Sequence, residues 1–316
     1  MCKRRYFMVH VIRLFGLCAI LLIVVAVAPQ PVVADSHVAF ALDEQPGQHL
    51  DIRYGKRVVA RYMTAFDPER WDETARPYLH VMDATGEKPI TKGLGGLFPH
   101  HRGIFIGYSR LRVGDQTYNL WGMGSGAQVH QAFVDQQVGP DQARFTSLVH
   151  WQTKDGQPLL EERRTFVFRA VPAPELLNVE VRSELTAVAG NVTLDGDPEH
   201  AGVQYRAADE LEKDATLYVF PTEDNDPRTD PDLAWSAMQY VLDGQTYAVV
   251  QMNHPSNPKQ TIWSAYRDYG RFGAFPKAEI AEGQTVELQY RFWITTGPLP
   301  ERQQIQARYE QYASTK

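Results

Sequence analysis

Two imidazoles and a guanidinium stand side by side in the segment 98–103, Phe-Pro-His-His-Arg-Gly. Imidazole titrates near neutral pH and can transfer protons, and an arginine beside it can steady developing negative charge. An apolar stretch, 104–108, follows directly and is typical of a strand. Adjacent residues of an extended chain point to opposite faces, so we expect only one of His100 and His101 to face a site. The alternative is a structural pair at the start of a strand.

A third histidine, His200, lies in an acidic stretch together with Asp197 and Glu199. A carboxylate bonded to an imidazole fixes its tautomer and prepares it for acid or base catalysis. The alternative is a solvated acidic loop. The residues predicted to be catalytic are His100, His101, Arg102, His200 and Glu199.

Tyrosines and arginines alternate between residues 266 and 273. This mixture suits a sugar, because an aromatic ring covers the apolar face of a pyranose and a guanidinium holds hydroxyls or a carboxylate. The proline-rich turn 253–258 contains another histidine, which can equally stabilise the turn. The residues predicted to bind substrate are His80, His254, Asn257, Arg206, Arg267 and Tyr269.

The histidines and nearby carboxylates are numerous enough to bind a divalent metal such as zinc. No tight spacing such as H-E-x-x-H occurs, so ligands would have to converge from distant strands, with His101 and His200 as the candidates. The sequence also has no Walker-type phosphate loop, no G-x-G-x-x-G and no G-x-S-x-G. Nucleotide cofactors and α/β-hydrolase chemistry are therefore not expected.

These residues would be positioned by β-strands. Short runs rich in Val, Phe, Tyr and Thr recur between turns that contain Gly, Pro, Asn or Asp, as in a large antiparallel structure. Apolar and polar residues alternate in 165–169 and 288–293, which indicates one buried and one solvated face. The predicted strands are 38–42, 50–54, 56–63, 103–113, 117–121, 130–138, 142–153, 159–170, 176–186, 216–220, 238–242, 245–253, 261–266, 272–275 and 285–295.

Two segments depart from this strand pattern. Residues 300–312 place Ile305, Tyr309 and Tyr312 on one helical face and predict a short C-terminal helix. Residues 190–214 are acidic and the least strand-like, so they are interpreted as a long loop that carries binding groups. No internal repeat or linker divides the rest of the chain, and 35–316 is predicted to be one domain.

The first 34 residues read as a signal peptide. Residues 1–13 contain four basic and no acidic side chains, and an apolar run, 14–28, follows. Cleavage is expected after Ala34, and export to the periplasm or the exterior follows from it. The apolar run of about 15 residues is shorter than the roughly 20 that span a bilayer, although an uncleaved anchor is the alternative.

The composition of the remaining chain limits the classes of partner that it can bind. Both cysteines, Cys2 and Cys18, belong to the leader, so the mature chain can form no disulfide. Loss of the leader removes four positive charges and no negative ones, which changes the formal charge from −6 to −10. A domain this acidic does not suit nucleic acid or an anionic membrane, and we expect a neutral or cationic partner.

Several motifs resemble one bacterial family. They are 77–80 (Pro-Tyr-Leu-His), 99–103 (Pro-His-His-Arg-Gly), 202–206, 253–258 and 267–275. The family is uncharacterised and carries the label "methane oxygenase PmoA", and the likeness covers most of the mature chain. The resemblance implies an exported β-sandwich protein that accompanies sugar oxidoreductases and carbohydrate-degrading enzymes. It adds weight to His100, His101, Arg102, His200 and His254 without giving any of them a role.

These features predict an all-β fold, a large antiparallel β-sandwich (a supersandwich resembling galactose mutarotase-like folds) with a short C-terminal helix. The predicted function is that of a carbohydrate-active hydrolase, lyase or epimerase-like enzyme acting on a glycoside or modified sugar by His/carboxylate acid-base chemistry. A non-catalytic carbohydrate-binding or matrix-interaction module is the alternative, because it needs the same concave site. The metal-dependent oxygenase of the family label is a weaker one. Genuine methane-oxidising subunits of that name span the membrane several times, whereas this chain has one hydrophobic segment.

Overall fold

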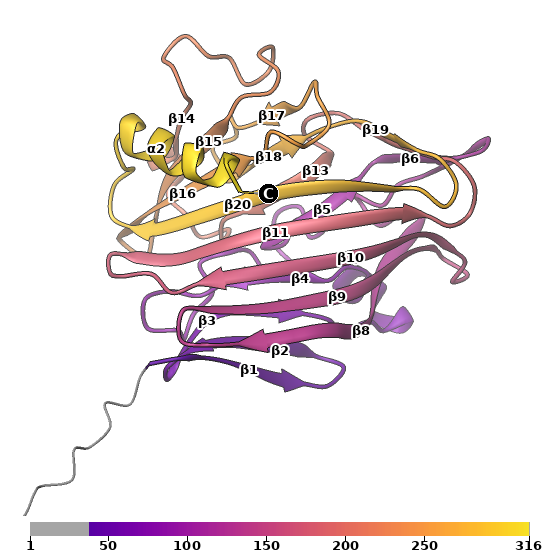
Figure 1. Cartoon of the computed structure of the whole chain (residues 1–316), viewed down its shortest axis with the longest axis horizontal. Coiled ribbons are helices and arrows are strands. Elements are labelled where there is room, and N and C mark those ends of the chain that lie inside the picture. The colour runs from indigo at the N-terminus through magenta and orange to yellow at the C-terminus, as the bar shows by residue number, and fades with distance from the viewer. Residues whose placement is uncertain (1–37, 316) are drawn as a thin grey trace, which may run out of the picture. The chain divides into compact units, whose positions relative to one another are not determined.

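A computed structural model describes residues 38–315 as two large antiparallel sheets, a small third sheet and a C-terminal helix (Figure 1). The signal segment 1–34 and its expected cleavage site lie outside the described residues. The predicted fold class, an all-β antiparallel sandwich with a short C-terminal helix, is confirmed. No helix in the range 38–315 is both long and apolar enough to cross a membrane.

The first sheet has eight strands, and every neighbouring pair is antiparallel. In spatial order they are β1 (Phe40–Gln45), β2 (His49–Tyr54), β3 (Arg57–Met63), β4 (Tyr78–Val81), β5 (Ile104–Tyr108), β13 (Ala201–Arg206), β18 (Arg271–Phe275) and β17 (Ile262–Ser264).

The second sheet also has eight antiparallel strands. In spatial order they are β14 (Leu217–Val219), β15 (Trp235–Leu242), β16 (Gln245–Asn253), β20 (Thr285–Thr296), β11 (Glu175–Ala187), β10 (Pro158–Arg169), β9 (Gln142–Thr153) and β8 (Gly126–Val138).

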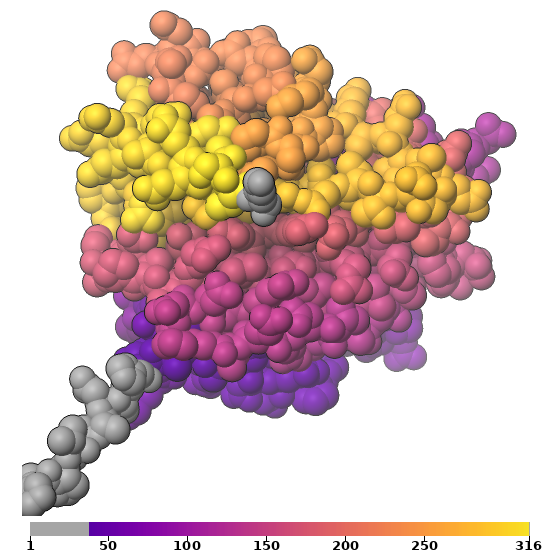
Figure 2. Space-filling model, in the orientation of Figure 1, coloured from indigo at the N-terminus to yellow at the C-terminus, as the bar shows by residue number. Residues whose placement is uncertain are grey.

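The remaining elements are short. The third sheet comprises β19 (Ala278–Ile280), β12 (Val192–Asp195), β6 (Arg110–Val113) and β7 (Gln116–Tyr118). The helices are η1 (Pro68–Arg70), α1 (Trp71–Thr74), η2 (Lys213–Ala215) and α2 (Arg302–Ala313). Helix α2 buries Ile305 and Tyr312 on the outer face of the second sheet. That face is turned to the viewer in Figure 2, and the first sheet lies behind it.

The inner faces of the two large sheets form the main core. Tyr62 of β3 packs against Phe145 of β9 and Phe166 of β10, with ring centroids 5.2 and 5.3 Å apart. Tyr205 of β13 places its hydroxyl 2.8 Å from that of Tyr240 of β15. Since side chains of a strand alternate between faces, every second residue of the first sheet faces away from this core.

One charged pair lies inside the core. Glu162 of β10 is fully buried and accepts hydrogen bonds from Trp151 Nε1 at 2.7 Å, Ser183 Oγ at 2.6 Å and Arg164 Nη2 at 2.6 Å. Arg164 in turn donates from Nη1 to the carbonyl of Pro77, just before β4 of the first sheet. The pair is therefore satisfied by hydrogen bonds and joins the two sheets.

The structure corrects two sequence-based boundaries. Residues 103–113, predicted as one strand, form β5 in the first sheet and β6 in the third. Residues 190–214, predicted as a loop, contain β12 and β13, and β13 lies between β5 and β18 near the centre of the first sheet. Its polar residues Gln204 and Arg206 mask the strand pattern, because they are buried on the sheet's outer face.

Candidate functional site

The outer face of the first sheet supplies the floor of the candidate site. Alternation along β13 sends Val203 and Tyr205 into the core and leaves Gln204 and Arg206 on the other face. Arg271 at the start of β18 is on that outer face, 3.3 Å from Gln204 Oε1. Although polar, these outward side chains are buried, because loops cover them.

The segment 98–103 forms a tight turn above this floor. Phe98 has φ 52°, and the amide of His101 donates to the Phe98 carbonyl at 2.9 Å. Gly103 follows with φ 48°, and a Cβ there would lie 2.2 Å from the Leu79 carbonyl oxygen. The expectation that His100 and His101 point to opposite faces is wrong. The turn precedes β5, and it places their rings 4.4 Å apart.

His101 is enclosed by aromatic rings. Its own ring is stacked with Phe105 and Tyr269 at centroid distances of 6.0 and 6.5 Å, and Trp121 meets it edge-on at 5.4 Å. Burial strongly lowers the pKa of His101. Burial, and then the charge of Arg76, lowers the pKa of His100 to about 4. Both rings are neutral at pH 7.

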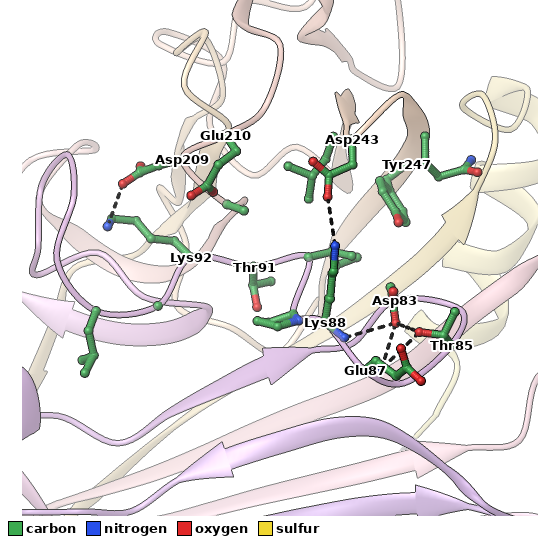
Figure 3. Close-up of a pocket in the computed structure, with 17 residues that line it drawn as sticks. Asp83, Thr85, Glu87, Lys88, Thr91, Lys92, Asp209, Glu210, Asp243 and Tyr247 are labelled. Carbon is green, nitrogen blue, oxygen red and sulfur yellow. Dashed lines mark hydrogen bonds and ion pairs between the residues drawn. The ribbon is translucent and has the colours of Figure 1, made fainter.

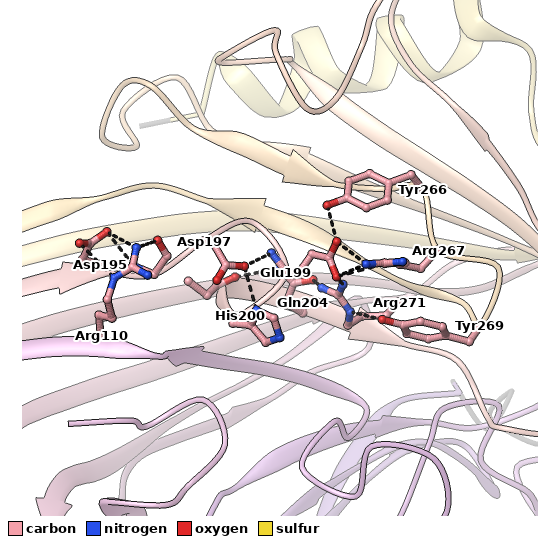
Figure 4. Close-up of polar contacts among 12 residues, drawn as sticks. Arg110, Asp195, Asp197, Glu199, His200, Gln204, Tyr266, Arg267, Tyr269 and Arg271 are labelled. Atoms are coloured by element: carbon pink, nitrogen blue, oxygen red, sulfur yellow. Dashed lines mark hydrogen bonds and ion pairs between the residues drawn. The ribbon is translucent and has the colours of Figure 1, made fainter. Parts of the chain in front are cut away.

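His200 is paired with a carboxylate, as predicted, and the partner is Asp197. His200 Nδ1 lies 2.8 Å from Asp197 Oδ1, and 51% of the His200 side chain is exposed (Figure 4). Its ring lies 6.2 Å from Trp121, edge-on. The charge of His200 also contributes to the low pKa of His100, which places the two histidines within electrostatic range.

Glu199 points away from His200 and is held by another set of donors. Arg267 reaches both of its oxygens, with distances of 2.5 and 3.1 Å to Oε2, and the Tyr266 hydroxyl donates to Oε1 at 2.9 Å (Figure 4). Burial alone would raise the pKa of Glu199, but the hydrogen bonds from Arg267 and Tyr266 outweigh it and lower the pKa. Glu199 is thus a carboxylate anchor beside the site.

The other end of the 195–200 loop is also fixed. Asp195 ends β12 and lies 2.6 Å from Arg112 Nη2 and 3.1 Å from Lys277 Nζ. Burial opposes ionisation there, but the Gly196 amide, Arg110 and Lys277 lower the pKa of Asp195 to about 2. The loop that presents Asp197 and His200 is therefore held by an ionised carboxylate at each end.

Two predicted arginines serve as supports. Arg102 donates to the carbonyls of Pro99, Asp72 and Glu73. Arg206 donates to the carbonyls of Ala207 and Tyr269 and is paired with Asp209. Their hydrogen bonds fix the covering loops in place.

Sequence reasoning missed Arg76 and Trp121. Arg76 donates to the carbonyls of His100, Leu120 and Trp121 and thereby joins two covering loops. Neither residue belongs to a motif, and their contacts exist only in the folded chain. Arg271 belongs to the stretch 266–273 that was selected for sugar binding, but it was not among the predicted binding residues, although alternation from the apolar Phe272 would have placed it outside the core.

Three predicted binding residues lie apart from this cluster. His254 bonds to Ser256 Oγ at 2.7 Å and to the Thr315 carbonyl at 3.2 Å, and it packs on Tyr312 of α2. Asn257 binds the backbone of Gln289 in the same region. Both hold the turn beside α2, on the opposite side of the sandwich. His80 of β4 is buried under the following loop and bonds to Thr91 Oγ1 at 3.0 Å.

Two cavities flank the cluster. One of about 170 Å³ is lined by Arg76, His100 and Arg102, together with residues of α1 and the 122–123 turn. A larger one of about 620 Å³ has the ion pair of Lys92 and Asp209 in its lining, together with other charged, polar and apolar residues (Figure 3). Within 38–315, no three His, Cys, Asp or Glu side chains converge to hold a metal ion, and this applies to the candidates His101 and His200.

Several solved structures are similar to the fold of this chain. A heparan sulfate lyase HepC mutant from Pedobacter heparinus aligns at 12% identity and a TM-score of 0.44, covering 83% of this chain and 38% of that one. A beta-arabinopyranosidase aligns at 12% identity and a TM-score of 0.35, covering 84% and 39%. A galactose mutarotase-like protein from Lactobacillus casei aligns at 7% identity and a TM-score of 0.38, covering 81% and 99%.

The chain thus spans about two fifths of the length of the first two proteins. No curated protein matches its sequence. Residues 49–310 match the model of a family of unknown function, DUF6807, and this range contains every residue of the cluster described above.

Proposed function

The chain belongs to the DUF6807 family, whose function is unknown, and from that premise we propose that it is an exported carbohydrate-active enzyme. It acts on a glycoside or modified sugar by acid-base chemistry, as a hydrolase, lyase or epimerase. The site is the cluster of His100, His101, Trp121, His200 and Tyr269 on the outer face of the first sheet.

The pairing of His200 with Asp197 carries this proposal. The carboxylate at 2.8 Å from Nδ1 favours the tautomer with its proton on Nδ1, which leaves Nε2 to accept or return a proton. The ring is half exposed and therefore reachable by a ligand. A histidine that only capped the loop would not need this exposure beside a buried tryptophan and a second imidazole.

The surroundings of His200 suit a sugar ring. Trp121 lies beside both His101 and His200, and Tyr269 lies beside His101. The loop that carries His200 is fixed at Asp195 and Glu199, so the imidazole is held in place before a ligand arrives. Preorganisation of this kind is what acid-base catalysis requires of its supporting residues.

The test uses the purified mature chain and a panel of neutral and acidic methyl and p-nitrophenyl glycosides, followed by proton NMR. This readout detects hydrolysis, elimination and epimerisation alike. We expect turnover of at least one glycoside and a loss of about 10²-fold or more in His200→Ala. A smaller loss is expected in Asp197→Asn, which keeps the shape but weakens control of the tautomer.

His150→Ala is the matched control. His150 lies on β9 in the second sheet, also beside a carboxylate, with Nε2 3.9 Å from Glu161. It should retain wild-type turnover. Full activity in a folded His200→Ala variant would overturn the proposed role of this residue.

A non-catalytic carbohydrate-binding module is the second candidate. The commitment of Arg102 and Arg206 to loop carbonyls favours it, since these groups shape a site without reaching the reacting atoms. Binding of a glycoside without turnover, unchanged in His200→Ala, would support this candidate. A metal-dependent oxygenase is the weaker alternative. A stoichiometric redox metal in the purified protein, together with oxygen consumption, would support it.

A further inference from the structure

Four buried guanidinium groups surround the paired histidines. Arg76, Arg102, Arg206 and Arg271 are each 4% exposed or less. The charges of Arg76 and Arg271 lower the pKa of both His100 and His101. Arg102 lowers the pKa of His100 in addition, and Arg206 that of His101. The four arginines therefore belong to one electrostatic neighbourhood.

The carboxylates nearby do not balance these charges. Asp209 pairs with Arg206 and also with Lys92, at 2.9 Å. Glu199 is bonded to Arg267 and lies 3.7 Å from Arg271 Nη2. In the part of the chain that the structure describes, Arg76 and Arg102 form no ion pair with a carboxylate. Arg102 bonds to carbonyls, and Arg76 bonds to carbonyls and to the sulfur of Met123. Buried positive charge without a counter-charge is costly, so an anion would stabilise this site.

Several polar atoms around His101 also lack partners. Among residues 38–315 these buried atoms include Arg271 Nη2, Trp121 Nε1, both ring nitrogens of His101, and Nε of Arg76 and of Arg206. Tyr269 links them in space, because its ring stacks on His101 and lies 5.9 Å from the Arg271 guanidinium carbon. Trp121 adjoins the same imidazole at 5.4 Å. Buried polar groups are almost always satisfied, so these atoms point to a ligand.

We infer that the ligand of this site is a sugar that carries an oxyanion, a carboxylate as in a uronic acid or a sulfate ester. This inference rests on the proposed carbohydrate function and specifies its substrate class. Arg271 Nη2 and Trp121 Nε1 donate to the oxyanion. The neutral His101 donates from one ring nitrogen and accepts a hydroxyl proton with the other, which matches an acidic group next to a hydroxyl.

This conclusion differs from the neutral or cationic partner expected from composition. Net charge averages over the whole surface, whereas recognition depends on the groups within a few ångströms of the ligand. Here the two carboxylates that pair with the buried arginines, Asp209 and Glu199, are also engaged by Lys92 and Arg267.

The test compares ligands that differ at a single carbon. Binding of methyl glucuronoside, methyl glucoside and methyl glucoside 6-sulfate is measured by titration calorimetry, with the corresponding galactosides as a second set. We expect an acidic sugar to bind about tenfold or more tightly than its neutral counterpart, because hydrogen bonds to charged groups are strong. The carboxylate and sulfate arms show which oxyanion the site takes.

Two variants connect this preference to the site. Arg271→Gln removes the charge, and Trp121→Phe keeps an aromatic ring but removes the indole N–H. Each should reduce the acidic preference at least severalfold while binding of the neutral sugar changes less. If Arg271→Gln does not fold, Trp121→Phe still tests the acidic preference.

Arg291→Gln is the matched control. Arg291 also lies over a tyrosine ring, 4.4 Å from that of Tyr312, but on the second sheet and paired with Glu180. It should keep the full preference. Equal binding of acidic and neutral sugars would overturn this inference alone. Binding of no sugar at all, in either set, would overturn the carbohydrate proposal together with it.

Discussion

The histidines of this chain differ in chemistry because their surroundings differ. His200 is half exposed and oriented by a carboxylate, whereas His80 is buried beneath a loop and faces a threonine hydroxyl. Burial, followed by the charges of Arg61 and Arg102, lowers the pKa of His80 to about 4. A group of this kind contributes to stability rather than to catalysis.

The lowered pKa of His80 gives a predicted pH dependence. In the unfolded chain an ordinary histidine binds its proton near pH 6.5, so between pH 6.5 and 4 the unfolded state holds more protons than the native one. The contribution of His80 to stability is therefore complete above pH 6.5 and falls by roughly 3 kcal/mol as the pH drops to 4. His100 and His101, whose pKa values are also lowered, add to the same slope, so urea unfolding at a series of pH values should show a smaller slope in His80→Gln than in the wild type. An unchanged slope in His80→Gln would contradict the assignment.

At the scale of single residues, the sequence indicated which side chains could do chemistry, but it did not indicate which residues they contact in the fold. The stretch 98–103 and His200 could be selected because imidazole next to Arg or carboxylate is recognisable without a fold. The partner of His200 proved to be Asp197, because the turn at 197–200 brings that side chain back to the ring. Arg76 and Trp121 reach the cluster only through tertiary contacts.

At the scale of elements, one carboxylate fastens the loop between β4 and β5. Asp209 pairs with Lys92 in the middle of the loop, accepts from the Leu97 amide at 2.9 Å and binds Arg206 of β13. Gly96 makes this contact feasible, since a Cβ there would lie 2.0 Å from Asp209 Oδ2. The loop exposes Leu94 and Leu97 and leads directly into His100 and His101.

Two neighbouring glycines of this loop allow a matched test. Gly95 and Gly96 have φ values of 71° and 64°, but only Gly96 would clash on substitution by alanine. Both variants should lose about 1–2 kcal/mol for the left-handed backbone. Gly96→Ala should in addition speed hydrogen exchange at the Leu97 amide, because it displaces Asp209 from that amide. Asp209→Asn should have the same effect on exchange, and Gly95→Ala should have none. Equal exchange at Leu97 in the two glycine variants would show that Asp209 does not fasten the loop.

Strand β13 shows why some elements could not be predicted. Its inward residues, Val203 and Tyr205, are apolar, but Gln204 and Arg206 give it the composition of a loop. These polar residues are buried because other loops cover the sheet, and a local pattern holds no information about such coverage. The long strands β9, β10 and β11 alternate buried residues with more exposed ones, and their alternation was visible. In β20 the predicted solvated face of 288–293 is wrong, because α2 covers Arg291 and Trp293 and both faces are buried there.

For the whole molecule, the buried Glu162 and Arg164 pair connects the two sheets. Arg164 Nη2 donates to Gln128 Oε1 at 2.9 Å, and Gln128 Nε2 donates to the Ile106 carbonyl of β5 at 2.8 Å. This chain of bonds lies directly beneath the strand that follows His100 and His101. A buried hydrogen-bond network whose members are all satisfied specifies one arrangement of the core. Removal of one member strongly destabilises the protein, because it leaves the other members buried without a partner.

Adjacent glutamates make this prediction testable. Glu162→Ala should lower the free energy of unfolding by about 3–5 kcal/mol, because it leaves the Arg164 charge buried without a partner. Glu161→Ala removes the neighbouring side chain, which is 46% exposed and points outward. This variant should change the free energy of unfolding by no more than about 1 kcal/mol. Guanidinium unfolding of both variants gives the comparison. Similar losses in the two would mean that the buried pair does not support the core.

The contrast between an acidic chain and its buried arginines bears on how fast and how selectively a ligand arrives. The formal charge of −6 repels an anion at long range, whereas the arginines attract it only once it has passed beneath the loops. Salt weakens the distant repulsion more than the buried attraction, so it should quicken arrival. A small sugar with one charge meets a low barrier, whereas a long polyanion meets repulsion along its whole length. The charge distribution therefore favours short acidic fragments over intact polymers.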